Sequence, residues 1–371
     1  MWGIGMILLG CTLACAAAER PPIEWDQTAH AGGGFKAPLE LSNGDILAVE
    51  TERTQPQGQR IVCRKSADGG LTWHFYGEIV RDESPADMGD GHIIQLRNGD
   101  ILYSYRHNVA WGPAENRSYR LEVAISKDGG RHWRHHSEVA ESLGCEYGLW
   151  STFLLEKRDG TLQCYYDDER TPADNGLPRH QWLTMKTWDP KSGQWTNPVT
   201  VSRAHNPEHL SRDGMPTVVE VAKNKLLCTL ETVQVAPPHR GLLMSVTSED
   251  GGKSWSWTKA ERKLLYQPKD INYNALAAWT ITLSDGRLLC VFTTDEDRTE
   301  PGVPATGVLS QDLKYMISRD KGRTWSKPAL IDANYPCYFP GVCELLHAKQ
   351  PGSVLVQYNG SLGHTAKMGR F

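Results

Sequence analysis

The sequence predicts an all-β protein built from six similar modules. An eight-residue motif recurs along the chain, a hairpin motif recurs between its copies, and no stretch keeps the 3.6-residue period of a long helix. The first motif reads Ser-x-Asp-x-Gly-x-(Thr/Ser/His)-Trp and occurs as SADGGLTW (66–73), SKDGGRHW (126–133), SEDGGKSW (248–255) and SRDKGRTW (318–325). A degenerate copy stands at TWDPKSGQW (187–195).

This first motif, called the Asp box below, has the composition of a tight turn. Its aspartate can accept hydrogen bonds from backbone amides, its glycine can take a positive φ, and its tryptophan can anchor the loop in the core. We therefore expect the Asp box to be structural.

The second motif is an apolar run, a turn of the Asn-Gly or Asp-Gly type, and another apolar run, which is a strong hairpin signal. Its copies are LSNGDILA (41–48), LRNGDILY (96–103), EKRDGTLQ (156–163), VAKNKLLC (221–228), LSDGRLLC (283–290) and KQPGSVLV (349–356). Six modules of about 55 to 66 residues, all strand and turn, predict a six-bladed β-propeller with four-stranded antiparallel blades around a channel.

The order of the strands predicts how the ring closes. The last hairpin copy is followed by too few residues for three further strands, so we expect PPIEWDQT (21–28) to supply the missing outer strand. The hairpin turns and the Asp boxes fall on one face of the disc, because the first and third strands of a blade run the same way. Functional residues are expected on the opposite face, in a single propeller domain over 19–371.

Composition and the N-terminus limit the function. The 371 residues carry a formal net charge of −4 and no basic block of the kind that binding to a phosphate backbone requires, which excludes a nucleic-acid partner. The apolar start, with Ala16 and Ala18 spaced for signal peptidase, predicts a signal peptide over 1–18 that is too short to span a bilayer. We expect a secreted or periplasmic monomer without cofactor or metal; lipid anchoring through Cys11 is the alternative.

The repeats and the stretch FKAPLELSNGDILA (35–48) resemble the sialidase superfamily, six-bladed propellers whose first inner strand opens Phe-Arg-Ile-Pro. The resemblance implies a glycoside hydrolase that removes a terminal sugar from a glycan or polysaccharide. In that family three arginines bind the substrate carboxylate, an aspartate acts as acid, and a tyrosine backed by a glutamate attacks the anomeric carbon.

The family's site residues are matched only in part. Lys36 stands where the first arginine is expected, and Glu231 where the second is expected. DINYNALAAW (270–279) supplies no third arginine, TERTQPQGQR (51–60) lacks the acid aspartate, and Tyr338 matches the tyrosine. These departures argue against strict specificity for sialic acid.

Two segments also resemble exo-arabinanase-type propellers. DGMPTVVEVAKNKLLCTLE (213–231) is similar to a Gly-Met-Pro strand that leads to a catalytic glutamate, which would place that role on Glu231. LQCYYDDE (162–169) is similar to an acidic strand end of the same propellers.

Side chains at the starts of first strands and the ends of second strands should converge on the channel mouth. The wider set there includes Asp87, Asp90 and His92. The candidates for catalysis are Glu231, Tyr338, Asp213 and Asp168, the last from the run 167–169. The candidates for substrate binding are Lys36, Arg53, Arg106, Arg212 and Trp150.

Two mechanisms fit these candidates. In the first, Tyr338 is a nucleophile activated by Glu231; in the second, Glu231 and either Asp213 or one residue of 167–169 share the acid and base roles. The alternatives to a hydrolase are a non-catalytic glycan-binding or scaffold propeller and, less favoured, a lyase that acts on uronate polysaccharides with a tyrosine or histidine base.

Overall fold

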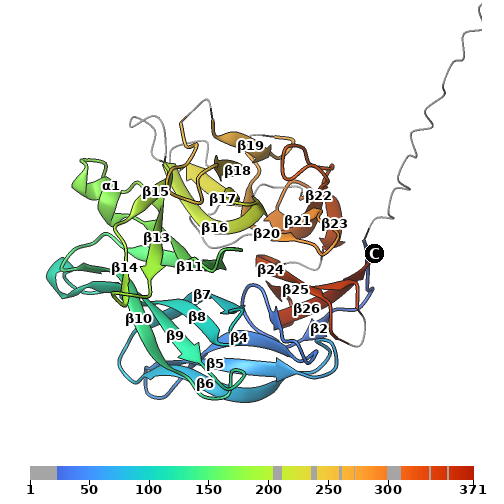
Figure 1. Cartoon of the computed structure of the whole chain (residues 1–371), viewed down its shortest axis with the longest axis horizontal. Coiled ribbons are helices and arrows are strands. Elements are labelled where there is room, and N and C mark those ends of the chain that lie inside the picture. Colours follow the sequence, from blue (N-terminus) through green and yellow to red (C-terminus); the bar gives the residue numbers. More distant parts are fainter. Residues whose placement is uncertain are drawn as a thin grey trace, which may run out of the picture.

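The computed structural model describes residues 23–203, 211–234, 240–258, 261–270, 272–298, 311–333, 336–348 and 351–371. Six antiparallel sheets stand around a common channel, which confirms the predicted six-bladed β-propeller (Figure 1). Within the described ranges, no helix has the length and apolar character needed to cross a membrane. The predicted signal peptide, including Cys11, lies outside these ranges.

In each blade the innermost strand comes first in the chain. Blades 1 and 2 consist of β3 (Leu39–Glu40), β4 (Ile46–Arg53), β5 (Gln59–Ser66) and β6 (His74–Asp82), then β7 (Asp87–Gln95), β8 (Ile101–Val109), β9 (Ser118–Ser126) and β10 (Arg134–Leu143). Blades 3 and 4 consist of β11 (Leu149–Glu156), β12 (Leu162–Asp168), β13 (Trp182–Asp189), β14 (Gln194–Trp195) and β15 (Val199–Ser202), then β16 (Ser211–Ala222), β17 (Lys225–Gln234), β18 (Arg240–Ser248) and β19 (Lys263–Tyr266). Blades 5 and 6 consist of β20 (Ala275–Thr282), β21 (Leu288–Thr294), β22 (Asp312–Ser318) and β23 (Ala329–Asp332), then β24 (Tyr338–Leu345), β25 (Ser353–Gly360) and β26 (Gly363–Arg370).

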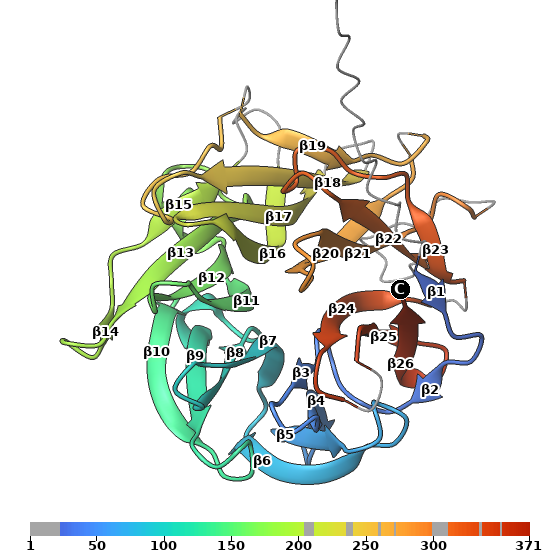
Figure 2. The same ribbon diagram turned by 45° about the vertical axis from the view of Figure 1, so that its right-hand side comes forward.

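The N-terminal segment closes the ring, as predicted. Two short strands, β1 (Glu24–Trp25) and β2 (His30–Ala31), both pair with β26 at the outer edge of blade 6 (Figure 2). Trp25 lies opposite Gly369, where a Cβ atom would come within 2.9 Å of the indole ring. Glycine at 369 therefore allows the strand and its tryptophan to pack closely.

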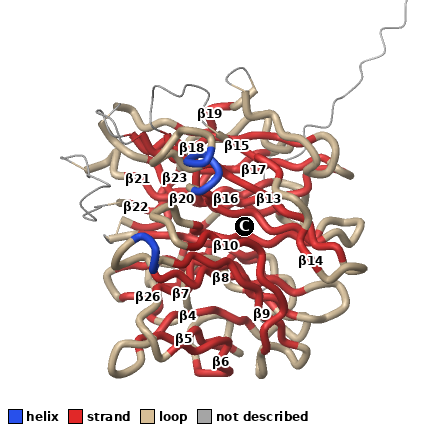
Figure 3. The backbone as a smooth tube through the Cα atoms, turned by 90° about the vertical axis from the view of Figure 1, so that its left-hand side faces the viewer, coloured by secondary structure: helices blue, strands red, loops and turns tan. Residues whose placement is uncertain are grey.

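Strands make up almost all of the regular structure (Figure 3). The helical segments of the described residues are a single turn at Ala114–Asn116 and α1 (Arg170–Asp174), which agrees with the lack of helical periodicity in the sequence.

The Asp boxes form the turns between the third and fourth strands, as predicted. In blade 1 the Ser66 hydroxyl accepts the Gly70 amide at 2.9 Å, and the Asp68 carboxylate accepts the Thr72 amide at 2.9 Å. The Trp73 indole donates to the Gly70 carbonyl at 3.0 Å. The boxes that begin at residues 126, 248 and 318 repeat the serine and aspartate contacts.

Aromatic side chains fill the channel below its mouth. His92 of blade 2 stacks on Phe153 of blade 3, with ring centroids 4.2 Å apart, and meets the Trp279 ring of blade 5 edge-on at 5.1 Å. Burial lowers the pKa of His92 to about 3, so this imidazole is neutral. The three rings come from the innermost strands of blades 2, 3 and 5 and contact one another across the channel.

Candidate functional site

The first strand of each blade is irregular where it meets the mouth. In blades 2 to 6 a β-bulge interrupts its pairing with the second strand, and in blade 1 Lys36, three residues before β3, bridges to Pro340. The residues at this position are Lys36, Asp90, Trp150, Met215, Ala277 and Phe339. Five of the six have a positive φ: +61° for Lys36, +53° for Asp90, Met215 and Ala277, and +49° for Phe339.

Positive φ is uncommon outside glycine and is a clear outlier for bulky residues. Bulges re-aim side chains, and repeated backbone strain gathers at functional sites. Here one strained position recurs around the ring and turns its side chains toward the axis. The mouth opposite the Asp boxes is therefore the candidate active site.

A cluster of ion pairs occupies the blade 1 and blade 2 side of the mouth. The Lys36 ammonium, 2% exposed, lies 2.5 Å from one oxygen of Asp90, and the Arg106 guanidinium lies 2.5 Å from the other. Arg106 also donates two hydrogen bonds to Asp87, at 2.9 and 3.1 Å. Burial would raise the pKa of Asp90, but the charges of Lys36 and Arg106 hold it below its usual value. The formal charges within this cluster cancel.

Asp167, at the end of β12, is the most perturbed carboxyl group of the mouth. It is 3% exposed, one of its oxygens has no hydrogen-bond partner, and the other lies 3.4 Å from the Met215 amide. Burial raises the pKa of Asp167 well above its ordinary value, and the negative charges of Asp90 and Glu231 raise it further. Asp167 is therefore a buried carboxyl group whose pKa is raised by burial and by the charges of two other carboxyl groups.

Glu231, near the end of β17, lies on the mouth side of blade 4. Its side chain is partly exposed, and one oxygen accepts the Ala277 amide at 2.7 Å. Burial raises the pKa of Glu231, while the hydrogen bond from Ala277 and the charge of Lys36 oppose that rise. Gly214 pairs with Glu231 across the sheet and leaves Asp167 room, because a Cβ atom at 214 would stand 3.1 Å from its carboxylate.

Arg212 and Trp150 lie around these carboxyl groups. Arg212 forms an ion pair with Glu169 and donates to the Gln181 side chain at 2.7 Å, and its charge acts on the pKa of Glu231. The Trp150 ring packs against Arg106 at 5.7 Å, and its buried indole nitrogen has no described hydrogen-bond partner.

Tyr338 and Arg53 lie on the blade 6 and blade 1 side. Tyr338 is half-buried one residue before the bulge position, which Phe339 takes, and the two ring centroids are 6.5 Å apart. Arg53 is exposed at the end of β4.

Asp168 and Asp213 lie in other surroundings. Asp168 points to the opposite face of β12 from Asp167, accepts the Thr171 amide at 2.9 Å and hydroxyl at 2.6 Å, and so holds the start of α1. Asp213 is fully buried between blades 3 and 4, where Ser202 donates to it at 2.6 Å and Arg262 pairs with it at 2.9 Å. The structure does not bring either carboxylate to Glu231.

A cavity of about 380 Å³ opens beside the ion-pair cluster, and we call it the side cavity. Its wall includes Phe35, Arg53, Asp87, Arg106, Phe339 and His364. The Phe35 and Phe339 rings pack at 5.2 Å between centroids, and Phe339 is 41% exposed.

Some residues of the mouth are predicted from the sequence and others are not. Asp87 and Asp90 are predicted at this face without a role, whereas Phe339 is not predicted there at all. The short strings Gly-Asp-Gly (89–91) and Phe-Pro-Gly (339–341) are the signal, because glycine and proline beside one residue often mark a bulge.

Comparisons with known proteins find the same architecture. No family model matches the sequence, and no curated protein does. Among solved structures, an α-L-arabinofuranosidase from Fusarium graminearum, solved with an iminosugar inhibitor, superposes with a TM-score of 0.65 at 18% identity, over 92% of this chain and 97% of that one. An α-L-arabinanase from Penicillium chrysogenum, complexed with arabinobiose, gives 0.60 at 17%, over 94% and 98%.

A Hadza microbial sialidase gives a TM-score of 0.61 at 17% identity, over 92% of this chain and 66% of that one. At these identities the likeness establishes the fold. The chain is a six-bladed β-propeller whose structural neighbours include sialidases and arabinan-type propellers, in agreement with the predicted resemblance. A shared fold does not fix the reaction, so the chemistry of this protein depends on the residues at its own channel mouth.

Proposed function

We propose that the protein is a glycoside hydrolase that removes a terminal sugar, with Asp167 as the general acid and Glu231 as the second carboxylate. The observation that carries this proposal is a buried Asp167, whose pKa is raised in part by the charge of Glu231, at a mouth where the first strands of the blades are strained. Hydrolysis of a glycosidic bond needs one protonated and one ionised carboxyl group at the anomeric centre. Environments that separate the two pKa values supply that pair.

Each group then has a defined task. Asp167 gives its proton to the leaving oxygen as the glycosidic bond breaks, and Glu231, ionised, supports the positive charge that develops on the sugar ring. A water molecule then forms the new bond to the anomeric carbon and returns a proton to the Asp167 carboxylate. The amide of Ala277 fixes the Glu231 carboxylate at 2.7 Å, so its orientation does not depend on the substrate. The glycosidase neighbours in the structural comparison support the same class of reaction.

The charges at the mouth support a neutral terminal sugar. Lys36 and Arg106 form ion pairs with Asp87 and Asp90, and Arg212 forms an ion pair with Glu169, so none of these cations is free for a substrate carboxylate. Glu231, ionised, adds a negative charge without a paired cation among the described residues, so a sugar carboxylate placed over it would be repelled. A sialidase reaction is thus the less favoured form of this proposal.

Two substitutions and two leaving groups test the proposal. On aryl glycosides of the correct sugar, Glu231→Gln should lower kcat/KM about 100-fold or more with any leaving group, because it removes the ionised carboxylate. Asp167→Asn should lower kcat/KM by as much with a poor leaving group. It should lower kcat/KM far less with dinitrophenolate, because that group departs without a proton. Glu141→Gln, which neutralises an exposed carboxylate on β10, is the matched control and should keep full activity.

The outcome against the proposal is a Glu231→Gln enzyme that turns over within about tenfold of the wild type. Glycan binding by a wild type that hydrolyses no member of the panel would instead identify a non-catalytic propeller.

A further inference from the structure

We propose that the side cavity binds the unit to which the terminal sugar is attached, and that Arg53 recognises an anionic group on that unit, a carboxylate or a sulfate ester. The inference rests on the proposed glycosidase and adds the chemical class of its leaving group.

The side cavity adjoins the proposed reaction centre. Asp90 lines the cavity and also acts electrostatically on both Asp167 and Glu231. A volume of about 380 Å³ lies within the range of small-ligand sites. A substrate whose terminal sugar lies over the two carboxyl groups can therefore extend its next unit into this space.

The aromatic wall of the cavity suits a sugar ring. Phe339 keeps 41% of its surface exposed while its backbone takes a φ of +49°, and Phe35 packs against it at 5.2 Å. Exposing a large apolar ring on a strained backbone is unfavourable for the free protein. Such a cost is typical of functional sites, and here the exposed face can stack on the apolar face of a sugar.

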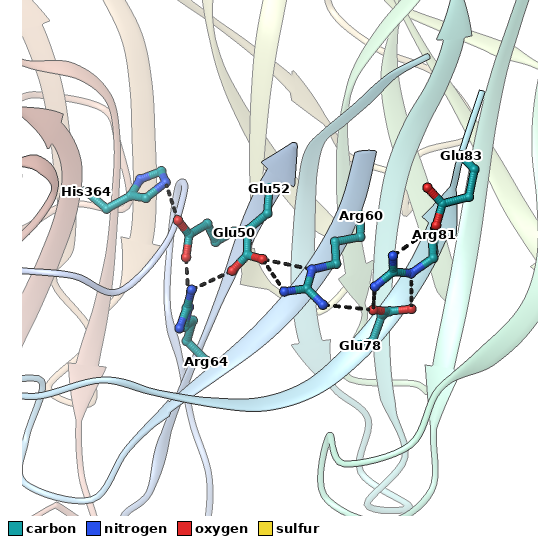
Figure 4. A network of polar contacts seen from close by, with 8 residues as sticks. All are labelled: Glu50, Glu52, Arg60, Arg64, Glu78, Arg81, Glu83 and His364. Carbon is teal, nitrogen blue, oxygen red and sulfur yellow. Dashed lines mark hydrogen bonds and ion pairs between the residues drawn. The ribbon is translucent and has the colours of Figure 1, made fainter. Parts of the chain in front are cut away.

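The cations around the cavity are nearly all paired. Arg106 is held by Asp87 and Asp90, as described above. On the neighbouring face of blade 1 a row of alternating charges pairs Arg64 with Glu50 at 2.8 Å and Arg60 with Glu52 at 2.8 Å (Figure 4). The same row continues outward, where Arg81 pairs with Glu78 and Glu83.

Arg53 differs from these guanidinium groups. It lies on β4 after Glu52, and strand alternation places it on the opposite face from the charge row. Among the described residues that line the side cavity, Arg53 is the permanently charged side chain without an ion pair or a hydrogen bond. Since the Lys36, Asp87, Asp90 and Arg106 cluster is neutral overall, Arg53 gives the cavity a net positive charge.

The strand that carries Arg53 is fixed against blade 2. The Thr51 hydroxyl donates to the Met88 carbonyl at 3.2 Å, and the Gln59 side chain accepts the Met88 amide at 2.8 Å. Gly89 permits this approach, because a Cβ atom there would come within 2.6 Å of the Thr51 hydroxyl. The guanidinium fork thus extends from an anchored base, and its geometry matches a carboxylate or a sulfate.

Matched disaccharides test the inference. After the aryl-glycoside panel has identified the terminal sugar, that sugar is linked to glucuronate, to a sulfated glucose and to glucose. The wild type should show a kcat/KM about tenfold higher for at least one of the two acidic disaccharides than for the glucose one. Their relative rates distinguish carboxylate from sulfate.

Arg53→Gln should bring the ratio of acidic to neutral rates to about one, and Arg53→Lys should leave an intermediate ratio because it keeps the charge without the fork. Arg323→Gln removes an exposed guanidinium on the Asp-box face and should keep the wild-type ratio. A wild-type ratio near one, or a ratio that Arg53→Gln leaves unchanged, overturns the inference.

The proposed function fails in a different way, namely through absence of hydrolysis by the wild type. In that case a binding screen of the wild type against the same panel identifies the terminal sugar, and calorimetry with the three disaccharides built from it decides the inference. Tighter binding of an acidic disaccharide that Arg53→Gln abolishes supports the assignment of Arg53, and equal binding of all three overturns it.

Discussion

Replacing Lys36 by methionine tests whether the ion cluster at the mouth is a buried structural unit. Lys36 is 2% exposed, and its ammonium lies 2.5 Å from Asp90. Methionine keeps the length and the apolar stem of the side chain and removes only the charge. It also keeps the positive φ of residue 36, so backbone strain cancels in the comparison with the wild type.

The expected loss follows from the contacts that remain. Removing one partner of a buried ion pair costs about 3 to 5 kcal/mol, because the other charge stays buried without compensation. Asp90 keeps Arg106 at 2.5 Å and the Ser151 hydroxyl at 2.6 Å. We therefore expect Lys36→Met to lower the free energy of unfolding at pH 7 by about 3 kcal/mol, the lower end of this range.

Urea denaturation across pH checks this value. The folded-state pKa of Asp90 is lowered, so the stability contributed by its ionised form is present above the unfolded pKa and is lost as the pH falls through the folded pKa. The difference in the free energy of unfolding between wild type and Lys36→Met should become smaller as the pH falls through the folded-state pKa of Asp90. Adding Asp90→Asn to Lys36→Met should recover part of the loss, because no unpaired carboxylate then remains.

A destabilisation below about 1 kcal/mol at pH 7, with no narrowing in acid, would show that solvent screens the pair. The ion-pair cluster of Lys36 and Asp90 would then be solvated and would contribute little to stability.

Three further predictions follow from the structure. The rate should fall in acid as Glu231 is protonated at its raised pKa and fall in alkali as Asp167 ionises at its own raised pKa, and a pH profile of kcat/KM checks both limbs. Protonated Asp167 contributes stability that is lost as the pH rises through its raised folded-state pKa, because ionisation of the buried carboxyl group is unfavourable. Asp167→Asn cannot ionise, so its stability relative to the wild type should increase over this pH range. Urea midpoints measure the difference. Gly70→Ala should destabilise by about 2 to 4 kcal/mol, since its φ is +93° and its Cβ would meet Leu355 at 2.8 Å. Gly99→Ala, with φ +92° and open space, should cost only about 1 to 2 kcal/mol in the same thermal or urea assay.

The fold could be predicted because its signals are local. Turn chemistry in the Asp boxes and in the Asn-Gly hairpins is written in adjacent residues, and six copies fix the number of blades. Even the closing strand at Glu24–Trp25 follows from counting strands in the last module.

The site could be predicted only in part, because it depends on which way strand ends turn. Glu231 stands out as a charge in an apolar strand, and the structure brings it to the mouth. In the run 167–169, alternation decides that Asp167 points inward and Asp168 outward, which requires a register that the sequence does not fix. The side chain that the bulge of each first strand presents at the mouth is likewise a tertiary feature: Phe-Pro-Gly (339–341) marks a bulge, but not that Phe339 lines a cavity.

The closure of blade 6 has a consequence for how the chain folds. Every other blade forms from one continuous run of sequence, so its hairpins need only short loops to close. Joining β1 to β26 brings together opposite ends of the described chain, at a much larger entropic cost that is met only when the remaining blades already hold those ends near each other. Assembly of the ring should therefore finish at this seam, and until it does the edge of β26 stays open to pairing with another molecule.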